Sequence, residues 1–146
     1  MYQHRRHGYS IGVPERQWSR TSVDGAVLAF RSPEGDFMSM MSRCRETAAP
    51  AALLARRLLI GLDERVLRQA GPVLLEGRNG WGQVLDARFE SRAVRIKTIT
   101  VVVQPCILDW VLVSPGDFAT AERSFDGWWS TFRAEPSASV GAGAAP

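Results

Sequence analysis

The sequence predicts an α+β domain, in which one twisted antiparallel β-sheet of about six to seven strands carries two main helices. Three observations support this fold class. Short runs of alternating apolar residues open the chain, a leucine-rich amphipathic segment follows, and longer strand runs then lead to a second amphipathic segment. Strands and helices do not alternate one by one, so a doubly wound parallel sheet is not expected.

Three short antiparallel strands should begin the domain. Tyr9, Ile11 and Val13 alternate with small or polar residues until Pro14 breaks the run. The segment 27–31 has the same pattern, and 37–45 follows it after a turn that contains proline and glycine, which indicates a hairpin.

The first helix is predicted directly after these strands. Thr47 is suited to the N-cap, and Pro50 falls in the first turn, where its missing amide hydrogen costs little. Gly61 is a suitable end, and apolar residues recur at helical spacing around it and before it: Leu53, Leu54, Leu58, Ile60 and Leu62. This apolar face should pack on the sheet.

The second half of the chain predicts further strands and a closing helix. A brief strand at 73–77 precedes a tight turn at Asn79 and Gly80, and long strands follow at 83–90, 94–103 and 106–113. Asp117 is the predicted N-cap of a helix that continues to about Arg133 and has an aromatic face.

These elements define one domain with a tail at each end. The 146 residues suffice for a single core, and we expect residues 8–134 to form it. Residues 1–7 are predicted to be flexible. Residues 135–146 are small and of low complexity, so burying them cannot offset the entropy of ordering, and they are predicted to be disordered.

Composition argues against two classes of partner. The net charge is +3, but the arginines are scattered among acids, whereas nucleic-acid binding concentrates them on one element. No run approaches the roughly 18 apolar residues that cross a bilayer. The first residues lack an export signal, which predicts the cytoplasm as written, with the envelope or periplasm as the alternative if a leader precedes them.

Reactive side chains do not form a recognisable catalytic set. His4 and His7 lie in the segment predicted to be flexible, without a third ligand, so neither a metal site nor a catalytic base is expected. Cys44 ends one predicted strand and Cys106 begins another; they can form one disulfide or remain two independent thiols.

Three residues are candidates for an interaction site. Trp128 and Trp129 are adjacent on the last helix and cannot share one narrow face, so they either belong to the core or leave one indole as a surface anchor. Asp109 interrupts an apolar strand, either because that strand face is exposed to water or because the carboxylate pairs with a neighbouring arginine in the interior.

Several motifs resemble the PsbP-like family, whose fold is that of a photosystem II extrinsic subunit and of Ran-binding relatives. The resemblance covers about residues 8–133 and rests on four features: the segment 8–14 leading to Trp18, the hairpin into Met38-Ser-Met, the helix after Thr47, and the terminal segment 125–133. A closer similarity is to small bacterial envelope lipoproteins, through segments 59–62 and 106–115 and the Glu76-Gly77 pair.

The resemblance implies an accessory or assembly role, places lipoprotein relatives at the cell envelope, and carries over no catalytic residue. This chain departs from those lipoproteins because it shows no lipidated cysteine near its first residue. We therefore expect a non-catalytic domain that binds another protein and needs no cofactor. The alternatives are a small-ligand carrier with an apolar pocket between helix and sheet, and a hydrolase or isomerase that would use Asp109, Glu76 or the cysteines.

Overall fold

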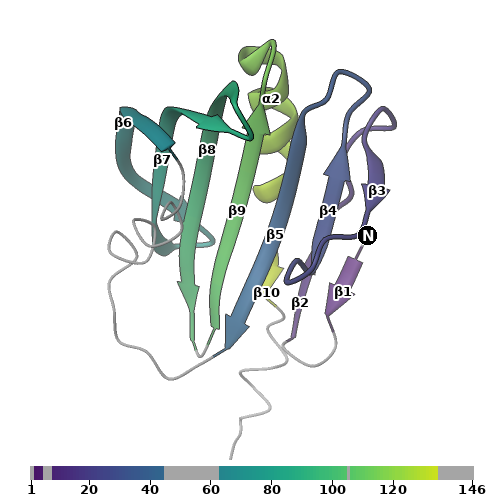
Figure 1. Ribbon diagram of the computed structural model, residues 1–146. Helices are drawn as coiled ribbons and strands as arrows, with labels where there is room; N and C mark the ends of the chain where they lie inside the picture. The colour runs from purple at the N-terminus through teal and green to yellow at the C-terminus, as the bar shows by residue number, and fades with distance from the viewer. Residues whose placement is uncertain (1, 5–7, 45–62, 105, 135–146) are drawn as a thin grey trace, which may run out of the picture.

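The computed structural model describes residues 2–4, 8–44, 63–104 and 106–134. Within them, seven antiparallel strands form one twisted sheet in the order β3-β4-β5-β9-β8-β7-β6, and three short strands form a second sheet in the order β1-β2-β10 (Figure 1). The strands of the large sheet are β3 (Ser19–Thr21), β4 (Leu28–Arg31), β5 (Phe37–Cys44), β6 (Asp63–Leu75), β7 (Arg78–Phe89), β8 (Arg92–Val103) and β9 (Cys106–Ser114). Those of the small sheet are β1 (Tyr2–His4), β2 (Tyr9–Ile11) and β10 (Arg133–Ala134).

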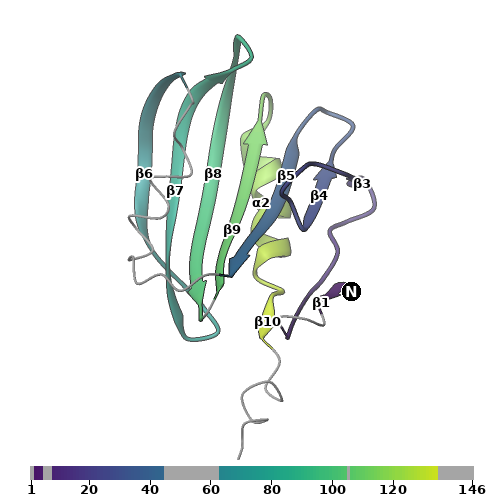
Figure 2. The same ribbon diagram turned by 60° about the horizontal axis from the view of Figure 1, so that its bottom comes forward.

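One helix, α2 (Phe118–Trp129), lies on one face of the large sheet, alongside β5 and β9 (Figures 1 and 2). Its buried residues are Ala121, Phe125 and Trp128. They pack on a row of side chains that alternate along the central strands, as half-buried strands require: Leu28, Phe30, Met38, Met40, Leu108, Trp110 and Leu112. This layer is the main core.

The antiparallel α+β class is confirmed in part. The large sheet has the predicted number of strands, but a second, three-stranded sheet accompanies it, so the prediction of a single sheet is wrong, and two main helices are not supported. The described residues contain a single helix, and the helix predicted after Thr47 falls in residues 45–62, outside them. The predicted tail at 135–146 also lies outside the described residues.

The turn between β6 and β7 differs from the prediction. Glu76 and Gly77 form it, both with positive φ (51° and 75°), as a primed hairpin turn demands. Asn79 and Gly80 lie inside β7 instead. A Cβ on Gly80 would stand 2.7 Å from the Thr100 carbonyl oxygen, so this glycine serves close packing of strands. The predicted brief strand is consequently the end of the longer β6.

Both ends of the domain also differ from expectation. Asp117 is the N-cap, with its Oδ1 accepting from the Thr120 amide at 3.2 Å, but α2 ends at Trp129 because β10 then pairs with β2. Residues 2–4, in a segment predicted to be flexible, form β1. They pair antiparallel with β2, and Tyr2 packs against the core.

Candidate binding groove

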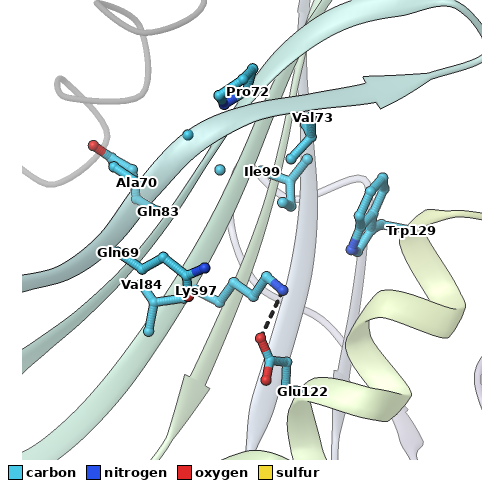
Figure 3. Close-up of a pocket in the computed structure, with 12 residues that line it drawn as sticks. Gln69, Ala70, Pro72, Val73, Gln83, Val84, Lys97, Ile99, Glu122 and Trp129 are labelled. Atoms are coloured by element: carbon cyan, nitrogen blue, oxygen red, sulfur yellow. Dashed lines mark hydrogen bonds and ion pairs between the residues drawn. The ribbon is translucent and has the colours of Figure 1, made fainter.

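A groove of about 200 Å³ lies between α2 and strands β6, β7 and β8 (Figure 3). The main core ends here, because α2 covers the centre of the sheet and not this side of it. Apolar and polar side chains both line the groove: Ala70, Pro72, Val73, Val84, Ile99 and Trp129, together with Gln69, Gln83, Lys97 and Glu122.

Two glycines, Gly71 and Gly82, shape the floor of the groove. Gly82 lies between Val73 and Ile99, and a Cβ there would come within 3.2 Å of a methyl carbon of each. A side chain at this position would need both neighbours to move. Gly71 also lines the groove and has no atom within 4 Å of the corresponding point, so it contributes open space. Open space therefore lies at Gly71, whereas the side chains of Val73 and Ile99 fill the space at Gly82.

An ion-pair network holds the helix beside the groove. Lys97 Nζ lies 2.8 Å from Glu122 Oε2 and 2.9 Å from Asp126 Oδ1. Burial lowers the pKa of Lys97, but the hydrogen bonds that Lys97 donates to Glu122 and Asp126, together with the charges of these carboxylates, outweigh burial, so the pKa is raised overall. The lysine is therefore an ammonium at neutral pH, and it faces two carboxylates.

The two tryptophans have separate roles. Trp128 is only 1% exposed and its Nε1 donates to the Gly12 carbonyl at 2.9 Å, so it belongs to the core. Trp129 is half-buried, and its indole lines the groove. Trp129 Nε1 donates to Asp126 Oδ1 at 2.9 Å, which fixes the orientation of the ring. Of the two adjacent indoles, Trp129 is therefore the one available to a ligand.

Asp109 is buried, with 1% of its surface exposed. The interpretation of a water-exposed strand face is wrong, and the alternative of a buried carboxylate that pairs with a neighbouring arginine describes the site, with Arg43 itself exposed. Thr100 Oγ1 donates to Asp109 at 2.7 Å, and Arg43 Nη2 lies 3.3 Å from the carboxylate. Burial raises the pKa of Asp109, and the contacts with Thr100 and Arg43 only partly oppose this.

The raised pKa predicts how Asp109 affects stability. A carboxyl whose pKa is higher in the folded state than in the unfolded state favours folding below the unfolded value, near 4, and this contribution is lost as pH rises through the folded value. Relative to Asp109→Asn, the wild type should therefore lose stability over the pH range that begins near 4 and extends upward through the folded pKa. Urea unfolding of both proteins across this range tests the sign, and a constant or widening advantage of the wild type would contradict it.

Cys44 and Cys106 form a disulfide. They are directly opposite each other in the register of β5 and β9, at the ends of those strands. Of the two alternatives that the sequence left open, the structure has the bonded pair. The cysteines do not line the groove. Glu76 does not line it either; its side chain accepts a hydrogen bond from the Ala134 amide at 2.8 Å, which connects β10 to the turn between β6 and β7.

Solved structures of other proteins have a similar architecture. The cyanobacterial PsbP protein (CyanoP) of Synechocystis superposes with a TM-score of 0.68 at 16% sequence identity, covering 91% of this chain and 90% of that one. The chain has a PsbP-like fold.

Two further structures share the PsbP-like fold. LpqN of Mycobacterium tuberculosis, described as involved in cell envelope biogenesis, gives a TM-score of 0.69 at 13% identity and covers 88% of this chain and 83% of its own. PA94 of Pseudomonas aeruginosa, of unknown function, gives 0.63 at 15% identity, covering 82% and 99%. No family model and no curated protein matches the sequence. Identities this low establish the fold alone.

The sequence predicted one residue of the groove, Trp129, but not the charged residues of the groove, Lys97 and Glu122. Lys97 is the only lysine of the chain and lies in a strand, β8, while Glu122 and Asp126 are four residues apart on the helix. Residues at that spacing share a helix face, so the three together were a signal for a contact between helix and sheet. No spacing rule links β8 to α2, because that contact is tertiary.

Two negative findings concern the described part of this PsbP-like domain. Within residues 2–4, 8–44, 63–104 and 106–134, no three histidine, cysteine, aspartate or glutamate side chains are grouped so that they could hold a metal ion. His4 lies in β1, and His7 lies outside these residues. Across the same ranges, no helix is long and apolar enough to cross a membrane.

Proposed function

We propose that this domain is a non-catalytic accessory module that binds a partner protein during assembly at the cell envelope. The observation that carries the proposal is the distribution of exposed apolar side chains. Among the described residues, six large apolar side chains are exposed, and four of them lie on β6 or at the end of β7: Val66, Leu67, Leu74 and Phe89. Several exposed apolar side chains along one edge of a sheet favour an interaction surface there, whereas single exposed apolar residues are ordinary.

The partner should contact these side chains without extending the sheet. β6 is an edge strand, and an edge can accept another strand through its free backbone groups. Pro72 lacks an amide hydrogen, and the pairing of β6 with β7 shifts register twice, between Asp63 and Val66 and between Leu67 and Gln69. Proline and bulges are the usual protection of an edge against strand addition. Contact through side chains is therefore favoured over strand addition as the mode of partner binding.

Two observations support a location at the envelope. Disulfides persist in oxidising compartments and are rare in the cytosol of most organisms, so the Cys44–Cys106 bond favours an exported protein. LpqN, with the same fold, is described as involved in cell envelope biogenesis. The cytoplasmic expectation from the first residues is accordingly not the one we propose.

Substituting the apolar edge should abolish partner binding and leave folding intact. In Leu67→Asp/Leu74→Asp, two side chains that are 57% and 67% exposed become charged, which should prevent burial in an interface at little cost to the free domain. Native mass spectrometry of protein purified from its own cells should show the loss of a co-purifying protein, with an unchanged thermal melt.

The matched control is Val23→Asp, because Val23 is also exposed (45%) but lies away from this edge. It should retain the partner. Equal recovery of the same protein by the wild type and the double variant would refute docking at β6.

The groove favours carriage of a small ligand as a second candidate function. It combines an apolar floor with a few polar groups, which is the usual composition of a ligand pocket. The same native mass spectra distinguish the two functions, since a carrier would show a bound small mass that Trp129→Ala removes and Leu67→Asp/Leu74→Asp does not.

A further inference from the structure

We infer that the groove beside Trp129 receives an arginine side chain of the partner protein. The inference rests on the proposed function and adds the chemistry by which the partner is recognised. Three features of the groove support it: its residual charge, its fixed indole and its size.

Lys97 and Glu122 line the groove and balance in charge, and Asp126, which lies beside the groove and pairs with Lys97, adds one negative charge. Two carboxylates, Glu122 and Asp126, face one ammonium, Lys97, which leaves a net charge of −1. The side chain of Lys97 is 16% exposed, whereas those of Glu122 and Asp126 are 31% and 41% exposed. An arriving group therefore meets the carboxylates before the ammonium.

One carboxylate oxygen is still available for a new hydrogen bond. Lys97 binds Glu122 through Oε2, and Glu122 Oε1 has no hydrogen bond within the described residues. Filling the groove with a purely apolar group would remove water from this oxygen without replacing its hydrogen bonds, which is costly. A donor with positive charge would bind it in a charge-assisted hydrogen bond.

The indole of Trp129 adds a preference for arginine among cations. Its hydrogen bond to Asp126 holds the ring in one orientation, so little conformational entropy is lost when a ligand stacks on it. A guanidinium is planar, stacks on an aromatic face and donates to a carboxylate at the same time, whereas an ammonium ion is a compact, strongly hydrated charge.

The size of the groove suits a side chain better than a cofactor. Pockets for drug-sized molecules measure roughly 300–1,000 Å³. This groove measures about 200 Å³, and its apolar floor of Val73, Gly82 and Ile99 would accommodate the methylene stem of an arginine.

A peptide titration tests this inference directly. The probe is acetyl-Leu-Arg-Leu-amide, and its control contains citrulline, which keeps the shape of arginine but lacks its charge. We expect the arginine peptide to shift the indole N–H resonance of Trp129 in NMR spectra, with at least tenfold weaker binding of the citrulline peptide. Glu122→Gln should weaken binding of the arginine peptide about fivefold, and Glu34→Gln, an exposed carboxylate elsewhere, should leave it unchanged.

The sole lysine provides an independent readout. Acylation of side-chain amines can occur only at Lys97, so the arginine peptide should slow it and the citrulline peptide should not. Equal binding of the two peptides, or no shift at Trp129, would overturn the inference. A shift of Trp129 that depends on protein concentration without peptide would also overturn it, because it would assign the groove to a second copy of this chain. The proposed function would fail separately, if Leu67→Asp/Leu74→Asp kept the partner.

Discussion

Replacing Cys44 and Cys106 by serine should lower the free energy of unfolding by about 4 kcal/mol. The disulfide joins residues 62 positions apart, and in the chain-entropy model a cross-link over a loop of this length restricts the unfolded chain by that amount. The closed loop contains β6, β7 and β8, so the bond restrains three of the seven strands of the large sheet. The melting temperature should fall by more than about 10 °C.

Urea unfolding with and without reductant measures this contribution. Reductant should destabilise the wild type by an amount close to the effect of the double serine substitution, and it should have no effect on Cys44→Ser/Cys106→Ser. A change of less than 1 kcal/mol in the wild type would show that the bond restricts the unfolded chain far less than its loop length implies.

Strands were predictable wherever side-chain alternation coincided with burial on one face. In β8 and β9 this is clear, because Ile99 and Val101, and Leu108 and Trp110, face the core at every second position. The predicted strand ends there were correct to within two residues. The N-cap at Asp117 was also predictable, since that hydrogen bond is local.

The errors arose where distant residues decide local structure. Asn79 and Gly80 have the composition of a turn, but Gly80 is needed where Thr100 and Val101 approach closely in the neighbouring strand. Asp109 looked like a solvent-facing residue because its partners, Thr100 and Arg43, are 9 and 66 positions away. For the same reason the groove could not be predicted from one segment, as its walls belong to β6, β7, β8 and α2.

Replacing Trp128 by alanine should lower the free energy of unfolding by about 3–5 kcal/mol, the usual cost of removing a large aromatic side chain from a core. Trp128 is 1% exposed and meets Phe30 edge to face, with ring centroids 5.3 Å apart. It also connects the two sheets. Its Nε1 donates to the Gly12 carbonyl, while the Gly12 amide donates to Thr131 Oγ1 at 2.8 Å.

Two further substitutions separate packing from hydrogen bonding and core from surface. Trp128→Phe keeps an aromatic ring but loses the donor to Gly12, so it should cost about 1–3 kcal/mol through the unpaired carbonyl and the reduced volume. Trp129→Ala removes a half-buried ring and should cost less than Trp128→Ala. Urea unfolding of Trp128→Ala, Trp128→Phe and Trp129→Ala measures the loss of unfolding free energy in each and so tests this order.

An equal cost for Trp128→Ala and Trp129→Ala would contradict the division of roles on which the groove depends. If Trp129 were as essential to folding as Trp128, its indole could not be regarded as a surface held ready for a partner. If Trp129→Ala is mild, the network of Lys97, Glu122 and Asp126 suffices to hold α2 on the sheet, because Lys97 on β8 pairs with two carboxylates of the helix. Trp129 would then be free to serve binding.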